Sequence, residues 1–212
     1  YWLYIKPEQQ KRLSLICFAL ALGAKVSVIW LPVVLLLTQW LQERALSKDD
    51  VRKLLPYFGL SLLFGVIAVV GKKHQITPLS PIDQLVLGGK STMFYVWQFF
   101  WPSAQSITHP HPTEFSTMRL DLIVPTILMV SAALLAFVKR KAWPLYSFAC
   151  AYVLLMLTPT FATFWKNGWV IFASDRYFYG PMLGLLLLVS PWVATQIHTR
   201  GKPVASICAV VF

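Results

Sequence analysis

The sequence is 212 residues long, and 57% of its residues are hydrophobic while only 13% are charged. With a mean hydropathy of +0.62, this composition exceeds what a soluble domain of that length can bury, so it excludes an ordinary water-soluble fold and predicts lipid-facing surface. The net charge of +11 comes from Lys and Arg spread between apolar runs, which argues against nucleic acid as a partner. In a membrane protein, such charges instead set the side on which each connection lies.

The first apolar stretch, residues 13–41, carries Lys25 in its middle and Pro32 soon after. It is predicted either as one long kinked helix, which would bury Lys25 within the membrane, or as a hairpin that has Lys25 at its outer tip. The residues leave both alternatives open.

Four further apolar runs approach the roughly 20 residues that a helix needs to cross a bilayer, and each is bounded by charge or proline. These runs are residues 55–71, 122–138, 143–159 and 179–197. Between the first two runs, residues 82–101 mix apolar and polar side chains around Gly88 and Gly89. This mixture predicts a helix that lies at the membrane surface.

The predicted fold class is therefore an all-α, polytopic integral membrane bundle with about six to seven transmembrane helices. Residues 1–212 are interpreted as a single transmembrane module, because no repeat period and no low-complexity linker divides them. This module is expected to be a fragment. The chain starts at Tyr1 without a leader sequence, and the apolar run 203–212 would form only half of a spanning helix.

Basic residues in the short connections predict the orientation of the module. The Lys-Arg-Lys turn at residues 139–141 lies on the same predicted side as residues 42–53 and 198–202, and this side is expected to be cytoplasmic. The longer segments 72–121 and 160–178 then face the exterior, the periplasm or the lumen. The expected location is a bacterial inner membrane or the endoplasmic reticulum.

Two groups of reactive side chains are interpreted as structural. Cys17, Cys150 and Cys208 fall inside apolar runs without the spacing of a zinc site or a disulfide framework. The adjacent Asp49 and Asp50 lie among basic residues in a predicted connection, which favours a solvated charge cluster over a catalytic pair.

His109 and His111, followed by Glu114, could suggest a metal site. However, the prolines that alternate with the histidines favour an extended chain, and no partner at helical spacing is present. A structural outer loop is the preferred interpretation, although acid or base chemistry by either histidine stays open. No metal and no cofactor are expected from the sequence.

The least ordinary segment places Asp175 beside Arg176 at the outer mouth of a predicted span. Charges at a membrane boundary are costly unless they have a partner, so this pair is a functional candidate. The structural alternative is that Asp175 caps the following helix and Arg176 extends to the interface. Lys25 poses the same choice, because its ammonium needs an anion such as a lipid phosphate unless it also extends to the interface.

The order of these features resembles the transmembrane and tetratricopeptide-repeat family, whose membrane part is similar to a C-type glycosyltransferase fold. The features are Ala24-Lys25, the proline-containing run to Trp40, Leu55-Pro56-Tyr57-Phe58, Trp101-Pro102-Ser103, His109-Pro110-His111-Pro112, and residues 175–181. The last is the most specific, since it fits the family pattern Asp/Glu-Arg-Tyr-x-Tyr-x-Pro. The chain departs from the family at residues 38–40, and at Gln98, where a Lys is expected.

The resemblance implies transfer of a sugar from a polyprenyl-phosphate carrier to an acceptor, which could be a protein, on the outer or lumenal face. The implied substrate-binding residues are Lys25, Asp175, Arg176, Tyr177, Tyr179, His109 and His111. Lys25 and Arg176 are expected to hold the phosphate. The family's catalytic acid would precede Tyr1, and its repeats would follow Phe212.

Two other functions remain open from the sequence. The chain could be a non-catalytic membrane anchor that presents tetratricopeptide repeats, because a fold does not determine an activity. It could also be a transporter of lipid-linked sugars, an interpretation that a Lys25 buried at mid-membrane would favour.

Overall fold

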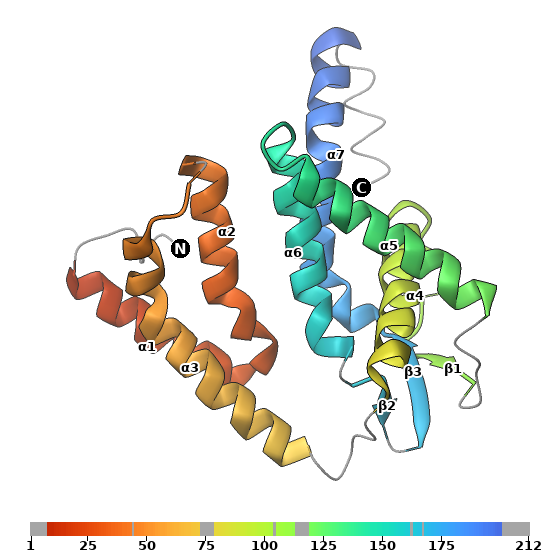
Figure 1. Cartoon of the computed structure of the whole chain (residues 1–212), viewed down its shortest axis with the longest axis horizontal. Helices are drawn as coiled ribbons and strands as arrows, with labels where there is room; N and C mark the ends of the chain where they lie inside the picture. Colours follow the sequence, from red (N-terminus) through yellow and green to blue (C-terminus); the bar gives the residue numbers. More distant parts are fainter. Residues whose placement is uncertain are drawn as a thin grey trace.

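The structure is a computed structural model that describes residues 8–43, 45–72, 79–103, 105–112, 119–161, 163–166 and 168–200. The N-terminal helices are α1 (Glu8–Ala24), the 3-10 helix η1 (Val26–Trp30), α2 (Leu31–Glu43) and α3 (Lys48–Lys72). The remaining helices are α4 (Pro81–Phe100), α5 (Leu120–Val138), α6 (Pro144–Phe161), the 3-10 helix η2 (Asp175–Tyr177) and α7 (Tyr179–Arg200). Three short strands, β1 (His109–His111), β2 (Trp165–Lys166) and β3 (Trp169–Ala173), complete the chain, which Figure 1 shows.

The first apolar stretch is broken at Lys25, so its interpretation as one continuous helix is wrong. Lys25 adopts an extended conformation, with φ −152° and ψ 111°, between the end of α1 and the start of η1. Its side chain is exposed. The break has a physical reason, since it allows the ammonium to reach a polar environment instead of lying in hydrocarbon. Ser61 of α3 supports the new direction by donating a hydrogen bond to the carbonyl of Ile29, at 2.9 Å.

Four segments are long and apolar enough to cross a membrane: Val26–Glu43, Lys48–Gly71, Leu120–Val138 and Pro144–Phe161. Their outer faces carry large exposed apolar side chains, such as Val69, which is 72% exposed. These features support the prediction of an α-helical membrane protein. The predicted count of six to seven spans stays a prediction, since α7 is not among the four and residues 203–212 lie outside the described residues.

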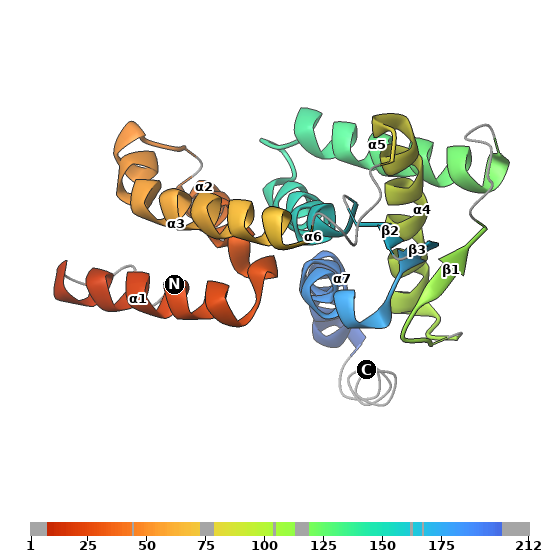
Figure 2. The ribbon, with the colours of Figure 1, turned by 90° about the horizontal axis from the view of Figure 1, so that it is seen from below.

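The basic connections lie together at one end of the molecule. Figure 1 shows the α2–α3 connection, the α5–α6 turn and the C-terminal end of α7 at its upper side. The three strands and the end of α3 lie toward the lower side. Figures 1 and 2 also show α6 and α7 side by side, while α4 crosses them obliquely. The alternation of basic and less basic connections along the sequence thus corresponds to two ends of the folded chain.

Helix α4 buries a face of mixed character and exposes large apolar side chains. Its buried residues include Gly89, Thr92 and Tyr95, while Ile82, Trp97 and Phe100 are more than half exposed. Small and polar residues on a buried face are typical of helices that pack within a membrane protein. Helix α4 is not among the four described segments that are long and apolar enough to cross a membrane, so the surface position predicted for residues 82–101 stays a prediction.

The close contact between α4 and α5 depends on Gly89. A Cβ atom at this position would lie 2.5 Å from the Cα atom of Thr126 in α5, closer than real side chains approach. Thr126 donates a hydrogen bond to the carbonyl of Leu122 at 2.7 Å, and its hydroxyl lies 3.3 Å from the carbonyl of Val86 in α4. Small residues and hydroxyl groups of this kind are typical of helix contacts in membranes.

The strands form an antiparallel sheet in the order β1-β3-β2, which the all-α prediction did not include. His109 lies opposite Ala173, and His111 lies opposite Val170. The sheet therefore joins the two segments that were predicted to face outward, residues 72–121 and 160–178. The extended chain predicted for the alternating prolines is confirmed as β1. Gly168, which begins the return into β3, has φ +81°, a conformation that glycine adopts without strain.

Asp49 is exposed, as the prediction of a solvated charge cluster expects, whereas Asp50 is buried and corrects that prediction. The Asp50 side chain lies 3.7 Å from Lys53 and accepts a hydrogen bond from the backbone N–H of Ser47 at 3.0 Å, while Oγ of Ser47 accepts from the backbone N–H of Asp49 at 3.3 Å. This reciprocal arrangement is a capping box. Helix α3 therefore begins before the predicted apolar run, inside the predicted connection 42–53.

Gly89→Ala is expected to destabilise the protein by about 1–3 kcal/mol, because the added methyl group would push α5 away from α4. Gly59→Ala is the matched control, since Gly59 lies inside α3 with no atom within 4 Å of its virtual Cβ. There the better helix propensity of Ala should leave stability equal or slightly higher. Thermal unfolding of the full-length protein in one detergent compares the two. Equal melting temperatures would contradict the close contact.

Candidate functional site

The carboxylate of Asp175 is the centre of a hydrogen-bond network at the sheet end of the molecule. Its Oδ2 accepts the backbone N–H of Ser106 at 2.6 Å. Its Oδ1 accepts from Nε2 of Gln98 at 3.3 Å and lies 3.0 Å from Nε2 of His109. The side chain thus joins η2 to α4, to β1 and to the segment before β1. Because it points to these groups, the prediction that it caps the following helix is wrong.

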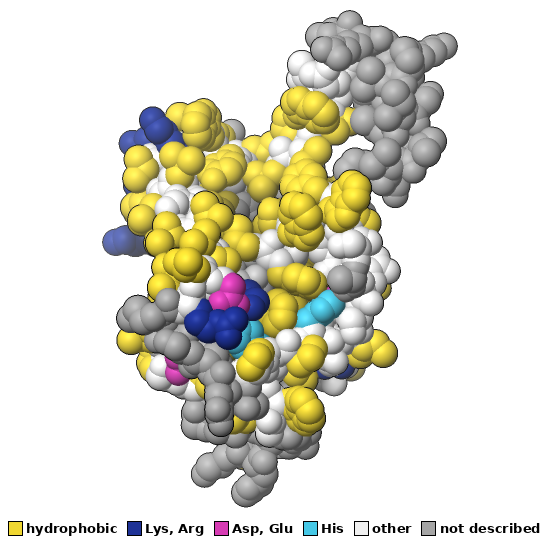
Figure 3. Space-filling model, turned by 90° about the vertical axis from the view of Figure 1, so that its right-hand side faces the viewer, with side chains coloured by type: hydrophobic (Ala, Val, Ile, Leu, Met, Phe, Trp, Pro, Cys, Tyr) yellow, Lys and Arg dark blue, Asp and Glu magenta, His cyan; other side chains and the backbone are white. Residues whose placement is uncertain are grey.

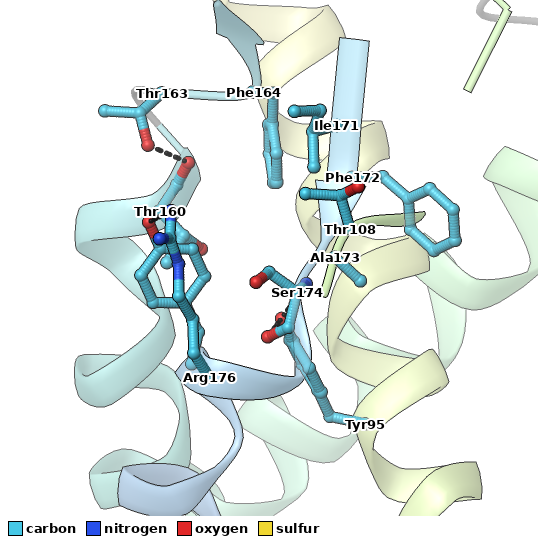
Figure 4. A pocket seen from close by; sticks show the side chains of 11 residues that line it. Tyr95, Thr108, Thr160, Thr163, Phe164, Ile171, Phe172, Ala173, Ser174 and Arg176 are labelled. Atoms are coloured by element: carbon cyan, nitrogen blue, oxygen red, sulfur yellow. Dashed lines mark hydrogen bonds between the residues drawn. The ribbon is translucent and has the colours of Figure 1, made fainter. Parts of the chain in front are cut away.

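Ser174, the residue before Asp175, is also held in place by hydrogen bonds. The hydroxyl of Tyr95 accepts the backbone N–H of Ser174 at 2.8 Å and donates to the carbonyl of Ser174 at 2.9 Å. Oγ of Ser174 donates to the carbonyl of Ile107 at 2.5 Å. Tyr95 is only 1% exposed, and its ring is stacked on Phe178 with the centroids 5.7 Å apart. Figure 4 shows Tyr95 reaching from α4 to Ser174.

Among the described contacts, Arg176 forms no ion pair with Asp175. Its guanidinium donates to the hydroxyl of Tyr177 at 2.9 Å and lies 4.8 Å from the centre of that ring. The Arg176 side chain is exposed, and Tyr179, the first residue of α7, is 74% exposed. The segment 175–181, called the motif below, is therefore divided. Asp175 forms hydrogen bonds within the protein, while Arg176 and Tyr179 are exposed.

A small cavity lies beside this motif, lined by Tyr95, Ser174, Arg176, Tyr177 and neighbouring residues (Figure 4). Its volume of about 40 Å³ has room for a few water molecules, far below the range of about 300–1,000 Å³ that is usual for ligand pockets. Neither Asp175 nor His109 lines it. In this conformation the cavity cannot hold a sugar, so a substrate would have to bind on the exposed side of Arg176.

His111 belongs to a second charged cluster. Its ring is buried at 4% exposure, with Nδ1 3.0 Å from the carbonyl of Pro112 and Nε2 3.9 Å from Asp121. Asp121 accepts hydrogen bonds from Lys90 at 2.8 Å and from Arg119 at 2.9 Å. Figure 3 shows Lys or Arg, Asp or Glu, and His side chains gathered on this face. The two histidines of β1 are therefore directed to two different carboxylates.

The structure brings together only some of the predicted site residues. His109, Asp175, Arg176 and Tyr177 are linked by the contacts above, with Tyr179 following them at the start of α7. Lys25 lies on the N-terminal helices, and no ion pair joins it to another residue in the described ranges. The described residues also contain no group of three or more His, Cys, Asp or Glu side chains suited to a metal ion, and Glu114 lies outside them.

Three residues of the network were not predicted as site residues: Tyr95, Gln98 and Ser106. Tyr95 and Gln98 are three positions apart, so both lie on one face of α4. That spacing, within a largely apolar helix, was the available signal. Ser106 takes part through its backbone N–H, which carries no sequence signature. Its role follows only from the folded position of the chain.

The buried ring of His111 predicts a pH-dependent stability. Burial lowers the pKa of His111 below its ordinary value, the carbonyl of Pro112 opposes this shift, and the charge of Lys90 adds to it. The unfolded chain then binds a proton before the folded chain does, so the stability is present above about pH 6.5 and is lost as the pH falls. The melting temperature should fall between pH 7 and pH 5, and less steeply for His111→Asn. Equal slopes for the two proteins would show that His111 is not the responsible group.

A scan against protein-family models, a search of curated proteins and a search of solved structures found no match to this chain. Similarity therefore assigns neither a family nor an activity to it.

Proposed function

We propose that this chain is the central membrane part of a glycosyltransferase that takes a sugar from a polyprenyl-phosphate carrier at the outer or lumenal face. The observation that supports this most is the division of the motif. A partly buried hydrogen-bond network holds Asp175, and the adjacent Arg176 of η2 is exposed. An arginine held in this way is suited to an anion that arrives from outside the protein.

The chemistry of a guanidinium fits a phosphate ligand. Arginine presents several N–H donors in a rigid plane that matches phosphate oxygens, and it is always charged. In Arg176 one donor is used by Tyr177, and the others have no partner among the described residues. The Tyr177 ring lies 4.8 Å from this cation, and the exposed Tyr179 follows two residues later, so a sugar ring could pack against either aromatic side chain. A carrier lipid would approach from the bilayer, beside α7.

In this proposal Asp175 is a positioning residue and not the catalytic base. Both of its oxygens accept hydrogen bonds from the protein, so its function is to set the direction of η2 and hence of Arg176. Lys25 is kept in the proposal as a second cation for a lipid phosphate because it is exposed at a break in the chain, although no described contact joins it to Arg176. The partners are the membrane lipid, the lipid-linked sugar and a possible protein acceptor.

A non-catalytic membrane anchor is the second candidate, and one observation favours it. The cavity beside the motif is only about 40 Å³ in volume, and the bonds of Asp175 all lead to other parts of the same chain. Under this alternative, the only role of the motif is to hold residues 72–121 and 160–178 together through hydrogen bonds. The transporter hypothesis has lost its main support, because Lys25 is exposed at the break before η1 and not inside a helix.

Arg176→Ala in the full-length protein is expected to lower sugar transfer by about 100-fold, the scale of losing one charge-stabilising donor. The measurement is transfer from a polyprenyl-phosphate hexose in proteoliposomes. Lys25→Ala should have a smaller effect, since no described partner orients its ammonium. Melting temperatures should stay unchanged for both variants, because both side chains are exposed.

Arg52→Ala is the matched control, since Arg52 is an exposed basic residue near the start of α3, at the opposite end of the molecule. It should leave transfer unchanged. Transfer that is equal in wild type, Arg176→Ala and Lys25→Ala would overturn the assigned site. Absence of transfer in the wild-type protein with every donor tried would favour the anchor.

A further inference from the structure

A second and larger cavity lies far from the Asp175 network, between α2, α5 and α6. Its volume is about 280 Å³. It is lined by Leu37, Trp40, Ala133, Ala136, Phe137, Arg140, Ser147, Cys150, Ala151 and Leu154. Helix α6 packs against both α2 and α5, and Figure 1 shows the α5–α6 turn at the end where the basic connections gather. The cavity thus lies where the N-terminal helices meet the rest of the chain.

The walls of this cavity are suited to a hydrocarbon chain. Nearly all the lining side chains are apolar, and the hydroxyl of Ser147 is already used within the protein, by the carbonyls of Ala136 at 2.7 Å and Trp143 at 3.0 Å. A polar ligand would find almost no partners inside. The volume is near the lower limit of ligand pockets, which suits part of one acyl chain.

The charge at the mouth of the cavity is strongly positive. Arg140 lines the cavity, and its guanidinium lies 4.4 Å from the centre of the Phe137 ring while one N–H donates to the Phe137 carbonyl at 2.8 Å. Its neighbours Lys139 and Lys141 are exposed as well. The sequence contains no Asp or Glu between Asp121 and Asp175.

No protein anion neutralises this turn within the described part of the chain. Glu43, at the end of α2, is exposed and forms no ion pair with Lys139, Arg140 or Lys141. The remaining N–H groups of Arg140 are therefore available to a ligand. Because the turn joins two helices that are fit to cross a membrane, it lies where lipid headgroups lie.

We propose that this cavity binds an acyl chain of an anionic phospholipid whose phosphate contacts the Lys-Arg-Lys turn at residues 139–141. The lipid comes from the leaflet at the basic end, so this site is separate from any carrier lipid at Arg176 and does not depend on the proposed sugar transfer. Bound there, the lipid fills the gap between α2 and α6 and neutralises the turn.

The test uses the full-length protein, delipidated in detergent and titrated with phosphatidylglycerol or phosphatidylcholine of identical acyl chains, with bound lipid counted by native mass spectrometry. Wild type should bind phosphatidylglycerol more tightly. Arg140→Gln should weaken phosphatidylglycerol binding about fivefold, the fold-change for one cation near a lipid surface, and leave phosphatidylcholine unaffected. Arg52→Gln, an exposed cation of α3 that does not line the cavity, should change neither.

Ala151→Phe tests the cavity itself, since Ala151 lines it from α6 and a phenyl ring would fill it. This variant should weaken the binding of both lipids. If it does not fold, Ala133→Phe fills the same cavity from α5. Equal binding of the two lipids to wild type would overturn the headgroup contact. An effect of Arg140→Gln without any effect of the filled cavity would place the lipid on the surface and overturn the acyl-chain site.

Discussion

The sheet end of this protein depends on one carboxylate, that of Asp175. Its oxygens accept from Gln98 of α4, from the backbone of Ser106 and from the ring of His109. These partners are 66–77 residues away in sequence, so the side chain determines where two long segments meet. A carboxylate without hydrogen-bond partners would be costly at this partly buried position. The network that satisfies Asp175 also fixes the backbone of η2, the element that carries Arg176.

The network in turn depends on how closely the helices approach. Helix α4 carries both Tyr95 and Gln98, and it can present them to η2 only because α5 and the end of α6 pack tightly on its other residues. A Cβ on Gly89 would meet Thr126 of α5, and a Cβ on Gly88 would lie 2.8 Å from the ring of Phe161. The glycines that suggested a surface helix are therefore the residues that allow a packed one. Position 98, where the resemblance expects Lys, is the position that donates to Asp175.

The long apolar helices could be predicted because bilayer thickness sets their length, and composition alone then reveals them. The packing of α4 could not be predicted in this way, since a mixture of small, polar and apolar residues does not show which face of a helix its neighbours cover. The sheet was missed because β1 and β2 are only three and two residues long, and because β1 pairs with β3, which lies far from it in sequence. For Asp175, the expected partners were the neighbouring Arg176 and the next helix, whereas the folded chain supplies more distant ones.

The two ends of the molecule differ in how their charged side chains are paired. At the sheet end, Asp121 is paired with Lys90 and Arg119, and Asp175 with His109, while no acid among the described residues pairs with Arg176. At the other end, the acids nearest in sequence to the turn at residues 139–141 are Asp121, in the first turn of α5, and Asp175. Under the two proposals, the first arrangement would hold one anion at a defined position, while the second would attract any anionic headgroup of a leaflet. Because a cavity lies between α2 and α6 near the turn at residues 139–141, the N-terminal helices contact the other helices partly through the ligand that fills this cavity. The stability of that contact should then depend on lipid, while the Asp175 network depends on protein groups alone.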